Sequence, residues 1–220
     1  MRTIALDTET TGFKFSEGHR MVEIGCVEMH NLIRTGNNFH VYINPQREVP
    51  IEAVNVHGLT YDKLKDKPLF ADIVDDFFNF IEDSPLVIHN AQFDVTFLND
   101  ELKNIGRNIL TNPIIDTLTL SRKKLQRLGR HNLDALCKYY KIDNSNRVLH
   151  GALLDADLLA QVYLELEGGA SYELDFVKNK TIPSSNSNDI VFKHKNFSID
   201  FFKATETELM YHEAMLKKFS

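Results

Sequence analysis

The chain has 220 residues, of which 43% are hydrophobic and 10% aromatic, and its formal net charge is -6. This length and composition fit one globular domain with a short appendage and argue against global disorder. The acidic balance argues against a protein that coats nucleic acid through a basic face, although local phosphate contact depends on where the cations lie. No apolar run reaches the length of a membrane span, and Cys26 and Cys137 lie in apolar stretches, as expected for reduced thiols of a cytoplasmic protein.

The first half of the chain begins with strands and continues with helices. Strand patterns occupy residues 3–6, 21–29 and 39–43, and residues 31–37, which include Gly36, are predicted to form the hairpin between the last two. Apolar residues then recur at helical spacing over 68–82, a compact apolar run predicts a buried strand over 86–88, and helical spacing resumes over 94–105.

The second half of the predicted domain alternates in the same way. A short strand is expected at 114–115, followed by helices over 118–128, 132–140 and 152–166. The basic run over 122–130 is best interpreted as a solvated helix face. Strands followed by helices in this order indicate an α/β sandwich whose opening strands are antiparallel.

The composition changes after residue 168. Residues 169–190 form a predicted flexible linker, because the stretch 178–189 is rich in Ser, Asn and Lys and has little to bury. Residues 191–220 form a predicted tail with an alternating apolar segment at 197–201 and a capping-box pattern at 205–208. This tail is too small to form its own core, so we expect it to pack against a partner.

Two carboxylates stand at the end of the first predicted strand, in the stretch LDTETTG. Side chains alternate along a strand, so Asp7 and Glu9 point to the same side. Like charges held this close repel, and one must take up a proton unless a cation lies between them. A solvated turn would also relieve the repulsion, so this pair alone does not decide between a metal site and a turn.

Two further stretches carry acids in unusual surroundings. HNAQFD places Asp94 where a buried strand gives way to a helix, a common ligand-binding position in α/β proteins, although Asp94 could equally be a helix N-cap. HGALLDA places Asp155 within an otherwise apolar helix, where an unpaired buried carboxylate is costly, and His150 lies beside it.

Together these segments supply four carboxylates, from Asp7, Glu9, Asp94 and Asp155. Two divalent cations would provide the counter-charge, and two-metal sites of this kind cleave phosphodiesters. Oxygen ligands favour Mg²⁺ or Mn²⁺. His150 is suited to accept the proton of the attacking water, because the pKa of a histidine lies near neutrality.

The order DxE, HNAxFD and HxxxxD resembles the signature of the DEDDh 3′–5′ exonucleases, and the wider similarity spans about residues 2 to 168. The resemblance implies a ribonuclease-H-like α/β fold, a mixed five-stranded sheet flanked by helices, with the exonuclease domain at 1–168. It implies that Asp7, Glu9 and Asp155 bind the metals directly, that Asp7 bridges them, that Asp94 reaches the second metal and that His150 is the general base.

The same resemblance implies a binding site for the terminal nucleotide. Glu52 and His57 match positions that contact this nucleotide, although both could be ordinary helix and turn residues. Phe93 and the backbone of residues 8–12 would help form its pocket. Asp7, Glu9 and Asp155 would also contact the substrate through the metals they hold.

Within the family, the similarity is greatest to the proofreading exonucleases of bacterial replicative polymerases. It implies removal of mismatched nucleotides from DNA 3′ ends, with the tail at 191–220 bound to the catalytic subunit of DNA polymerase III. An RNA-trimming exoribonuclease and a non-catalytic, polymerase-stabilising subunit are the alternatives. Leu174 and Phe176 are expected either to bind a sliding clamp or to pack back onto the nuclease domain.

Overall fold

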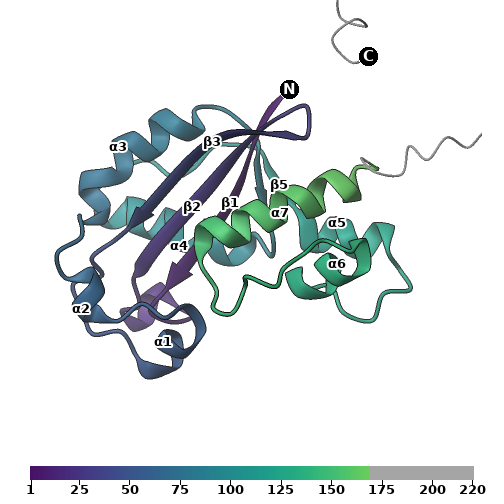
Figure 1. Ribbon diagram of the computed structural model, residues 1–220. Helices are drawn as coiled ribbons and strands as arrows, with labels where there is room; N and C mark the ends of the chain where they lie inside the picture. Colours follow the sequence, from purple (N-terminus) through teal and green to yellow (C-terminus); the bar gives the residue numbers. More distant parts are fainter. Residues whose placement is uncertain (169–220) are drawn as a thin grey trace, which may run out of the picture. The chain divides into compact units, whose positions relative to one another are not determined.

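The computed structural model describes residues 1–168, in which helices surround a β-sheet (Figure 1). The predicted linker at 169–190, the predicted tail at 191–220 and the candidate clamp-binding residues Leu174 and Phe176 lie outside the described residues. Within residues 1–168, no helix combines the length and apolar character needed to cross a membrane.

The centre of the unit is a mixed sheet of five strands in the order β3-β2-β1-β4-β5. The three long strands β1 (Arg2–Thr10), β2 (Met21–His30) and β3 (Ile33–Tyr42) are antiparallel to one another. The short strands β4 (Leu86–Ile88) and β5 (Ile114–Asp116) are parallel to β1 and to each other. This arrangement confirms the predicted mixed five-stranded sheet with an antiparallel opening.

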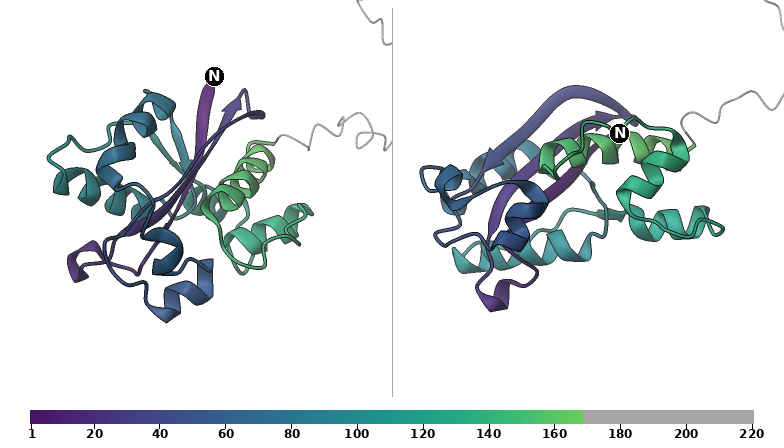
Figure 2. Two further views of the ribbon diagram at one scale, coloured as in Figure 1. Left: turned by 60° about the vertical axis from the view of Figure 1, so that its left-hand side comes forward. Right: turned by 60° about the horizontal axis from the view of Figure 1, so that its bottom comes forward.

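Helices cover both faces of the sheet (Figure 2). One face packs against α3 (Phe70–Ile81) and α4 (Gln92–Asn104), and the other against α6 (Leu133–Tyr140) and α7 (Ala152–Leu166). The shorter helices are α1 (Ile51–His57), α2 (Tyr61–Leu64) and α5 (Thr117–Lys124), with a 3-10 turn at Phe15–Glu17.

Strand β1 contributes to both cores because its side chains alternate. Ile4 and Leu6 lie in the cluster with α3 and α4, whereas Ala5 lies in the cluster with α6 and α7. Asp7 and Glu9 have the same parity as Ala5, so they continue the face of β1 that α7 covers. The strand that anchors both cores therefore carries the two acids toward α7.

The structure corrects two predicted boundaries. The hairpin turn consists of Asn31 and Leu32 alone, with φ of 51° and 68°, and β3 already begins at Ile33 rather than after residue 37. Positive φ at both central residues gives the primed turn that matches the twist of paired strands. The helix predicted over 118–128 ends at Lys124, so only part of the basic run is helical.

Candidate active site

The N-terminus of α7 approaches the sheet closely, and Gly25 of β2 allows it to do so. Gly25 pairs with Asp7 of β1, and a Cβ atom at residue 25 would lie 2.3 Å from the Ala152 carbonyl carbon. Any side chain there would push α7 away from the sheet. The first turn of α7, which carries Asp155, is thereby held beside the acids of β1.

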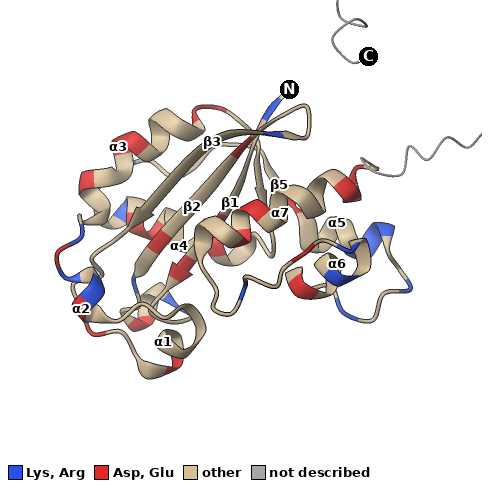
Figure 3. Cartoon of the chain, in the orientation of Figure 1, with Lys and Arg blue, Asp and Glu red and all other residues tan. Residues whose placement is uncertain are grey.

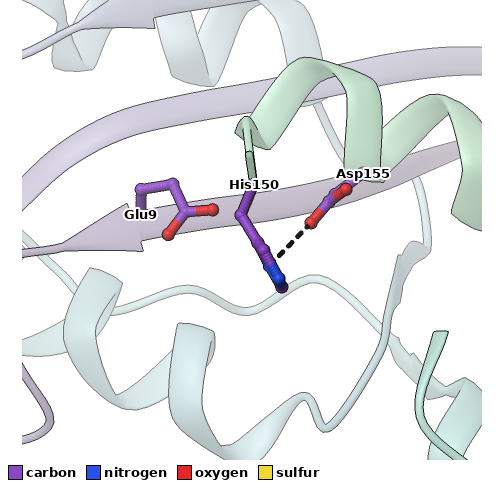
Figure 4. A group of neighbouring side chains, drawn as sticks. All are labelled: Glu9, His150 and Asp155. Atoms are coloured by element: carbon purple, nitrogen blue, oxygen red, sulfur yellow. Dashed lines mark ion pairs between the residues drawn. The ribbon is translucent and has the colours of Figure 1, made fainter. Parts of the chain in front are cut away.

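Glu9, His150 and Asp155 form a compact group of potential ligands (Figure 4). One ligand atom from each lies within 4.8 Å of the others, and His150 Nδ1 is 3.4 Å from Asp155 Oδ2. Asp155 is 3% exposed, whereas 45% of the His150 side chain is exposed. The His150 backbone N–H donates to the Val56 carbonyl of α1 over 3.0 Å, which fixes the segment before α7.

Asp94 joins the site from the opposite side of β1. It lies in the first turn of α4 and is 4% exposed, and its Oδ1 accepts a 2.6 Å hydrogen bond from the Thr8 hydroxyl. The N-cap of α4 is Ala91, so Asp94 is not the helix cap that the sequence left open as an alternative. Asp94 therefore faces β1, where the other acids lie.

Burial raises the pKa values of three of these acids, and for Asp7 and Glu9 the charges of neighbouring acids add to the effect. Burial raises the pKa of Asp7 well above its ordinary value, and the charges of Asp94, Asp155 and Glu9 raise it further. Burial, followed by the charge of Asp155, raises the pKa of Glu9 to about 8. Burial raises the pKa of Asp94 to about 7, although the Thr8 hydrogen bond opposes the shift. Figure 3 shows acidic positions of β1, β2 and α7 close together in this part of the sheet.

This donor set fits divalent cations. Four carboxylates offer hard oxygen ligands, and burial raises the pKa values of Asp7, Glu9 and Asp94, so bound cations would stabilise their charged forms. Asp7, Glu9, Asp94 and Asp155 are the residues that could hold such ions, with His150 beside them. The structure thus brings the five residues predicted from the sequence to one place.

Arg147, which no sequence motif singled out, lies among these residues. Its Nε and Nη2 donate to Asp155 Oδ1 and Oδ2 over 2.5 and 2.7 Å, and Nη2 also donates to His150 Nδ1 over 2.8 Å. Nη1 donates to Asp134 Oδ1 over 2.8 Å, and the Arg147 side chain is 7% exposed. Burial opposes its charge, but the bonds to Asp155 and Asp134 raise its pKa above the ordinary value. The buried Asp155 in an apolar helix was the signal that a cation had to be nearby.

A cavity of about 400 Å³ opens beside the acids. Glu9, Glu52, His57 and Phe93 line it, together with residues 10–12. His57 and Glu52 come from α1, a helix that we did not assign from the sequence. His19, which sequence reasoning also missed, forms part of the wall, and a Cβ atom at Gly12 would clash with its ring.

His57 has a defined hydrogen-bonding state. Its Nδ1 accepts from the Leu59 backbone N–H over 3.1 Å, and burial lowers its pKa, so the ring is neutral and carries its hydrogen on Nε2. Among the described residues, His57 Nε2 is buried without a hydrogen-bond partner. A buried donor without a partner is uncommon in proteins, and His57 is one of the residues that line the cavity.

The fold agrees with comparisons to known proteins. The exonuclease family model matches residues 4–163, and the chain belongs to this family. The nuclease domain of 3′hExo, a DEDDh family member bound to rAMP, has a TM-score of 0.68 at 14% identity, with 77% of this chain and 92% of that chain covered. Exonuclease X in complex with 5′ overhanging duplex DNA has a TM-score of 0.60 at 24% identity, with 78% and 93% covered. These likenesses confirm the ribonuclease-H-like fold.

Relatives in sequence show to which group of exonucleases the chain belongs. DNA polymerase III subunit epsilon of Rickettsia conorii is 49% identical over 99% of this chain and 96% of the relative. The subunit of the same name from Escherichia coli K12 is 44% identical over 98% and 92%. The protein is a proofreading 3′–5′ exonuclease of this group.

Proposed function

We propose that the protein hydrolyses the terminal phosphodiester bond of DNA 3′ ends at the cluster formed by Asp7, Glu9, Asp94, Asp155 and His150. The observation that carries this proposal is the convergence of Glu9, His150 and Asp155 within 4.8 Å, beside Asp7 and Asp94, whose pKa values are raised. Asp7, Glu9 and Asp155 are the direct ligands in this proposal, Asp7 is shared, and Asp94 supports the second ion.

Two Mg²⁺ or Mn²⁺ ions, when bound, would polarise the phosphodiester and promote in-line attack by water. The protein's own contribution is positional. Strand β1 holds Asp7 and Glu9 on one side of the cluster, and the first turn of α7 holds Asp155 on the other. The hydroxyl of Thr8 fixes one oxygen of Asp94, so the four acids reach the site on rigid elements rather than on loops.

His150 is the proposed general base. Its imidazole lies next to Asp155, and its exposed portion can release a proton to bulk water after accepting it. The bond from its backbone N–H to Val56 holds the residue at the entrance of α7. Both features suit a group that takes a proton repeatedly without moving far.

The neighbouring cavity is the proposed site for the terminal nucleotide. The neutral His57 offers an N–H donor, Glu52 offers an acceptor, and Phe93 supplies an apolar wall. A frayed or single-stranded end enters such a site without the cost of breaking base pairs. We therefore expect mismatched ends to be removed faster than matched ends, as proofreading requires.

The proposed partner is DNA polymerase III, because the relatives of 44–49% identity are named as a subunit of that polymerase. The tail at 191–220 would bind the catalytic subunit, and Leu174 with Phe176 would contact the sliding clamp. The protein would work in the bacterial cytoplasm, where the replicative polymerase acts.

End-labelled oligonucleotides test this function directly. The protein is incubated with Mg²⁺ and single-stranded DNA, matched primer–template, primer–template with a 3′ mismatch, and RNA of the same sequence. We expect stepwise shortening from the 3′ end, fastest for single strands and mismatched ends. Preference for RNA would favour the exoribonuclease alternative, and no cleavage of any substrate would favour the non-catalytic alternative. The Asp155→Asn variant is the background control.

A further inference from the structure

The Arg147 guanidinium binds the same atoms that the proposed cations and the proposed base need. Its Nε and Nη2 occupy both oxygens of Asp155, at 2.5 and 2.7 Å. These two atoms are the only carboxylate oxygens that Asp155 has to offer a metal ion. A paired guanidinium and carboxylate of this geometry is among the stronger side-chain interactions in proteins.

Arg147 also binds His150, and while this bond persists His150 cannot act as a general base. A guanidinium has only donor groups, so His150 Nδ1 must be the acceptor in their 2.8 Å hydrogen bond. The lone pair of Nδ1 is therefore occupied. A neutral imidazole then carries its hydrogen on Nε2, so neither ring nitrogen can accept a proton from water while this bond persists.

From these contacts we infer that Arg147 is an internal counter-cation: a side-chain positive charge that balances the acids and that divalent ions must displace before the site becomes active. This inference rests on the proposed function, because it assumes that Asp155 is a metal ligand. Divalent ions and the guanidinium would compete for the same two oxygens of Asp155. Their positive charges would also repel one another if both bound this one carboxylate.

Asp134 gives the displaced guanidinium a place to remain paired. It lies on α6, accepts from Arg147 Nη1 over 2.8 Å, and its side chain is 52% exposed. Arg147 itself belongs to the segment between α6 and α7. A short turn in this segment is closed by a 3.0 Å hydrogen bond from the Arg147 backbone N–H to the Asn144 carbonyl. A rotation of the side chain toward Asp134 would free both Asp155 and His150 together.

This role makes a prediction that a merely structural ion pair does not. If Arg147 must leave when cations bind, its removal lowers stability without metal and increases metal affinity. If Arg147 only orients Asp155, its removal leaves metal affinity unchanged or weakens it. The sign of the change in metal affinity therefore separates the two roles.

The test measures Mn²⁺ binding to the full-length protein by calorimetry and by electron paramagnetic resonance, and thermal unfolding in chelator and in saturating Mn²⁺. For Arg147→Gln we expect Mn²⁺ affinity to increase on the order of tenfold. The unfolding temperature should fall below wild type in chelator, and the difference should shrink in Mn²⁺. Arg147→Lys retains the charge but not the two-pronged bond, so an intermediate affinity is expected, and this variant remains informative if the glutamine variant does not fold.

Arg2→Gln is the matched control. Arg2 is also partly buried and pairs with Glu28 over 2.6 Å, but both residues lie outside the acid cluster. We expect its loss to lower the unfolding temperature equally in chelator and in Mn²⁺ and to leave Mn²⁺ affinity unchanged. Unchanged or weaker Mn²⁺ binding by both Arg147 variants, with normal binding by wild type, would overturn the counter-cation role alone. Absence of Mn²⁺ binding by wild type would overturn the proposed metal site itself.

Discussion

The hydroxyl of Thr8 donates to Asp94 Oδ1 over 2.6 Å and so joins the central strand to the first turn of α4. Thr8 is 6% exposed and Asp94 is 4% exposed, so water does not readily replace this bond. Thr8 lies on the opposite face of β1 from Asp7 and Glu9. The bond therefore holds an acid of α4 near enough to the cluster for its charge to raise the pKa of Asp7.

Replacement of Thr8 by valine should reduce nuclease activity by about 10- to 100-fold, because a hydrogen bond to a charged group contributes about 1.5–3 kcal/mol. Valine keeps the shape of threonine but leaves one oxygen of Asp94 unbound. Initial rates on single-stranded DNA provide the measurement. Thr3→Val is the matched control: Thr3 lies on the same strand, and its buried hydroxyl lacks a partner among the described residues. That variant should retain full activity, and equal losses in the two variants would contradict the role of Thr8.

Replacement of Asp7 by asparagine should abolish activity but not folding. The change removes a proposed metal ligand, and it also removes a charge whose neighbours repel it, as the raised pKa of Asp7 shows. We therefore expect Asp7→Asn to be at least as stable as wild type in chelator. Activity assays and thermal unfolding should be run on the same preparation. Asp62→Asn, at an exposed acid that is not part of the cluster, is the control. It should change neither the activity nor the unfolding temperature. A stable variant with full activity would contradict the proposed ligand.

His150→Gln should lose about 10²–10⁴ in turnover, the range expected when a general base is removed. Metal affinity should change much less, because the carboxylates remain. Turnover and Mn²⁺ affinity need to be measured together, with His30→Ala as a control on an exposed histidine of β2. A large loss of Mn²⁺ affinity would identify His150 as a metal ligand rather than a base.

The stability of the protein in chelator should fall as the pH rises from 7 to 9. Burial raises the pKa of Glu9 to about 8 and that of Asp7 well above its ordinary value, so the folded protein binds protons that the unfolded chain has already released. When the folded state holds more protons, the free energy of unfolding decreases with rising pH. The pKa values of His57 and His89 are lowered by burial, so these two residues titrate below this window.

Unfolding temperatures across this pH range, with chelator or with excess Mg²⁺, provide the measurement. Bound cations would stabilise the charged acids, so we expect the slope to flatten in Mg²⁺. A slope of the opposite sign in chelator would show that the acids are already compensated by other groups. A slope that persists unchanged in Mg²⁺ would argue against cation binding at the cluster.

Truncation after Gly169 should leave nuclease activity intact and abolish co-elution with the polymerase catalytic subunit. The described domain contains every residue of the proposed site, whereas the proposed polymerase contact lies within 191–220. Replacement of Phe197 and Phe201 by aspartate in the full-length chain should have the same effect, since both are proposed apolar contacts. Ser185→Asp in the predicted linker is the control. Co-elution of the truncated protein would place the contact on the nuclease domain instead.

Periodicity along the chain determined much of the fold. The apolar spacing of α3 and α7 predicted these helices within one or two residues of their observed bounds, because the apolar residues of each helix face a core. Three short motifs also determined which acids would meet, since Asp7, Asp94 and Asp155 each interrupt an element that otherwise buries apolar residues. Local patterns of this kind depend on neighbours within one or two turns, so they can be read from the sequence alone.

Contacts between distant segments were decided only by the tertiary structure. The role of Gly25 depends on how closely α7 approaches β2, and the cavity depends on α1 lying beside the segment after β1. Arg147 lies in a polar stretch with no periodicity, so its neighbours in the sequence did not predict its burial against Asp155. The only indication was that a buried Asp155 needs a partner. The partners of a buried charge come from segments that are far apart in the sequence. Patterns among neighbouring residues therefore do not predict which of them will meet.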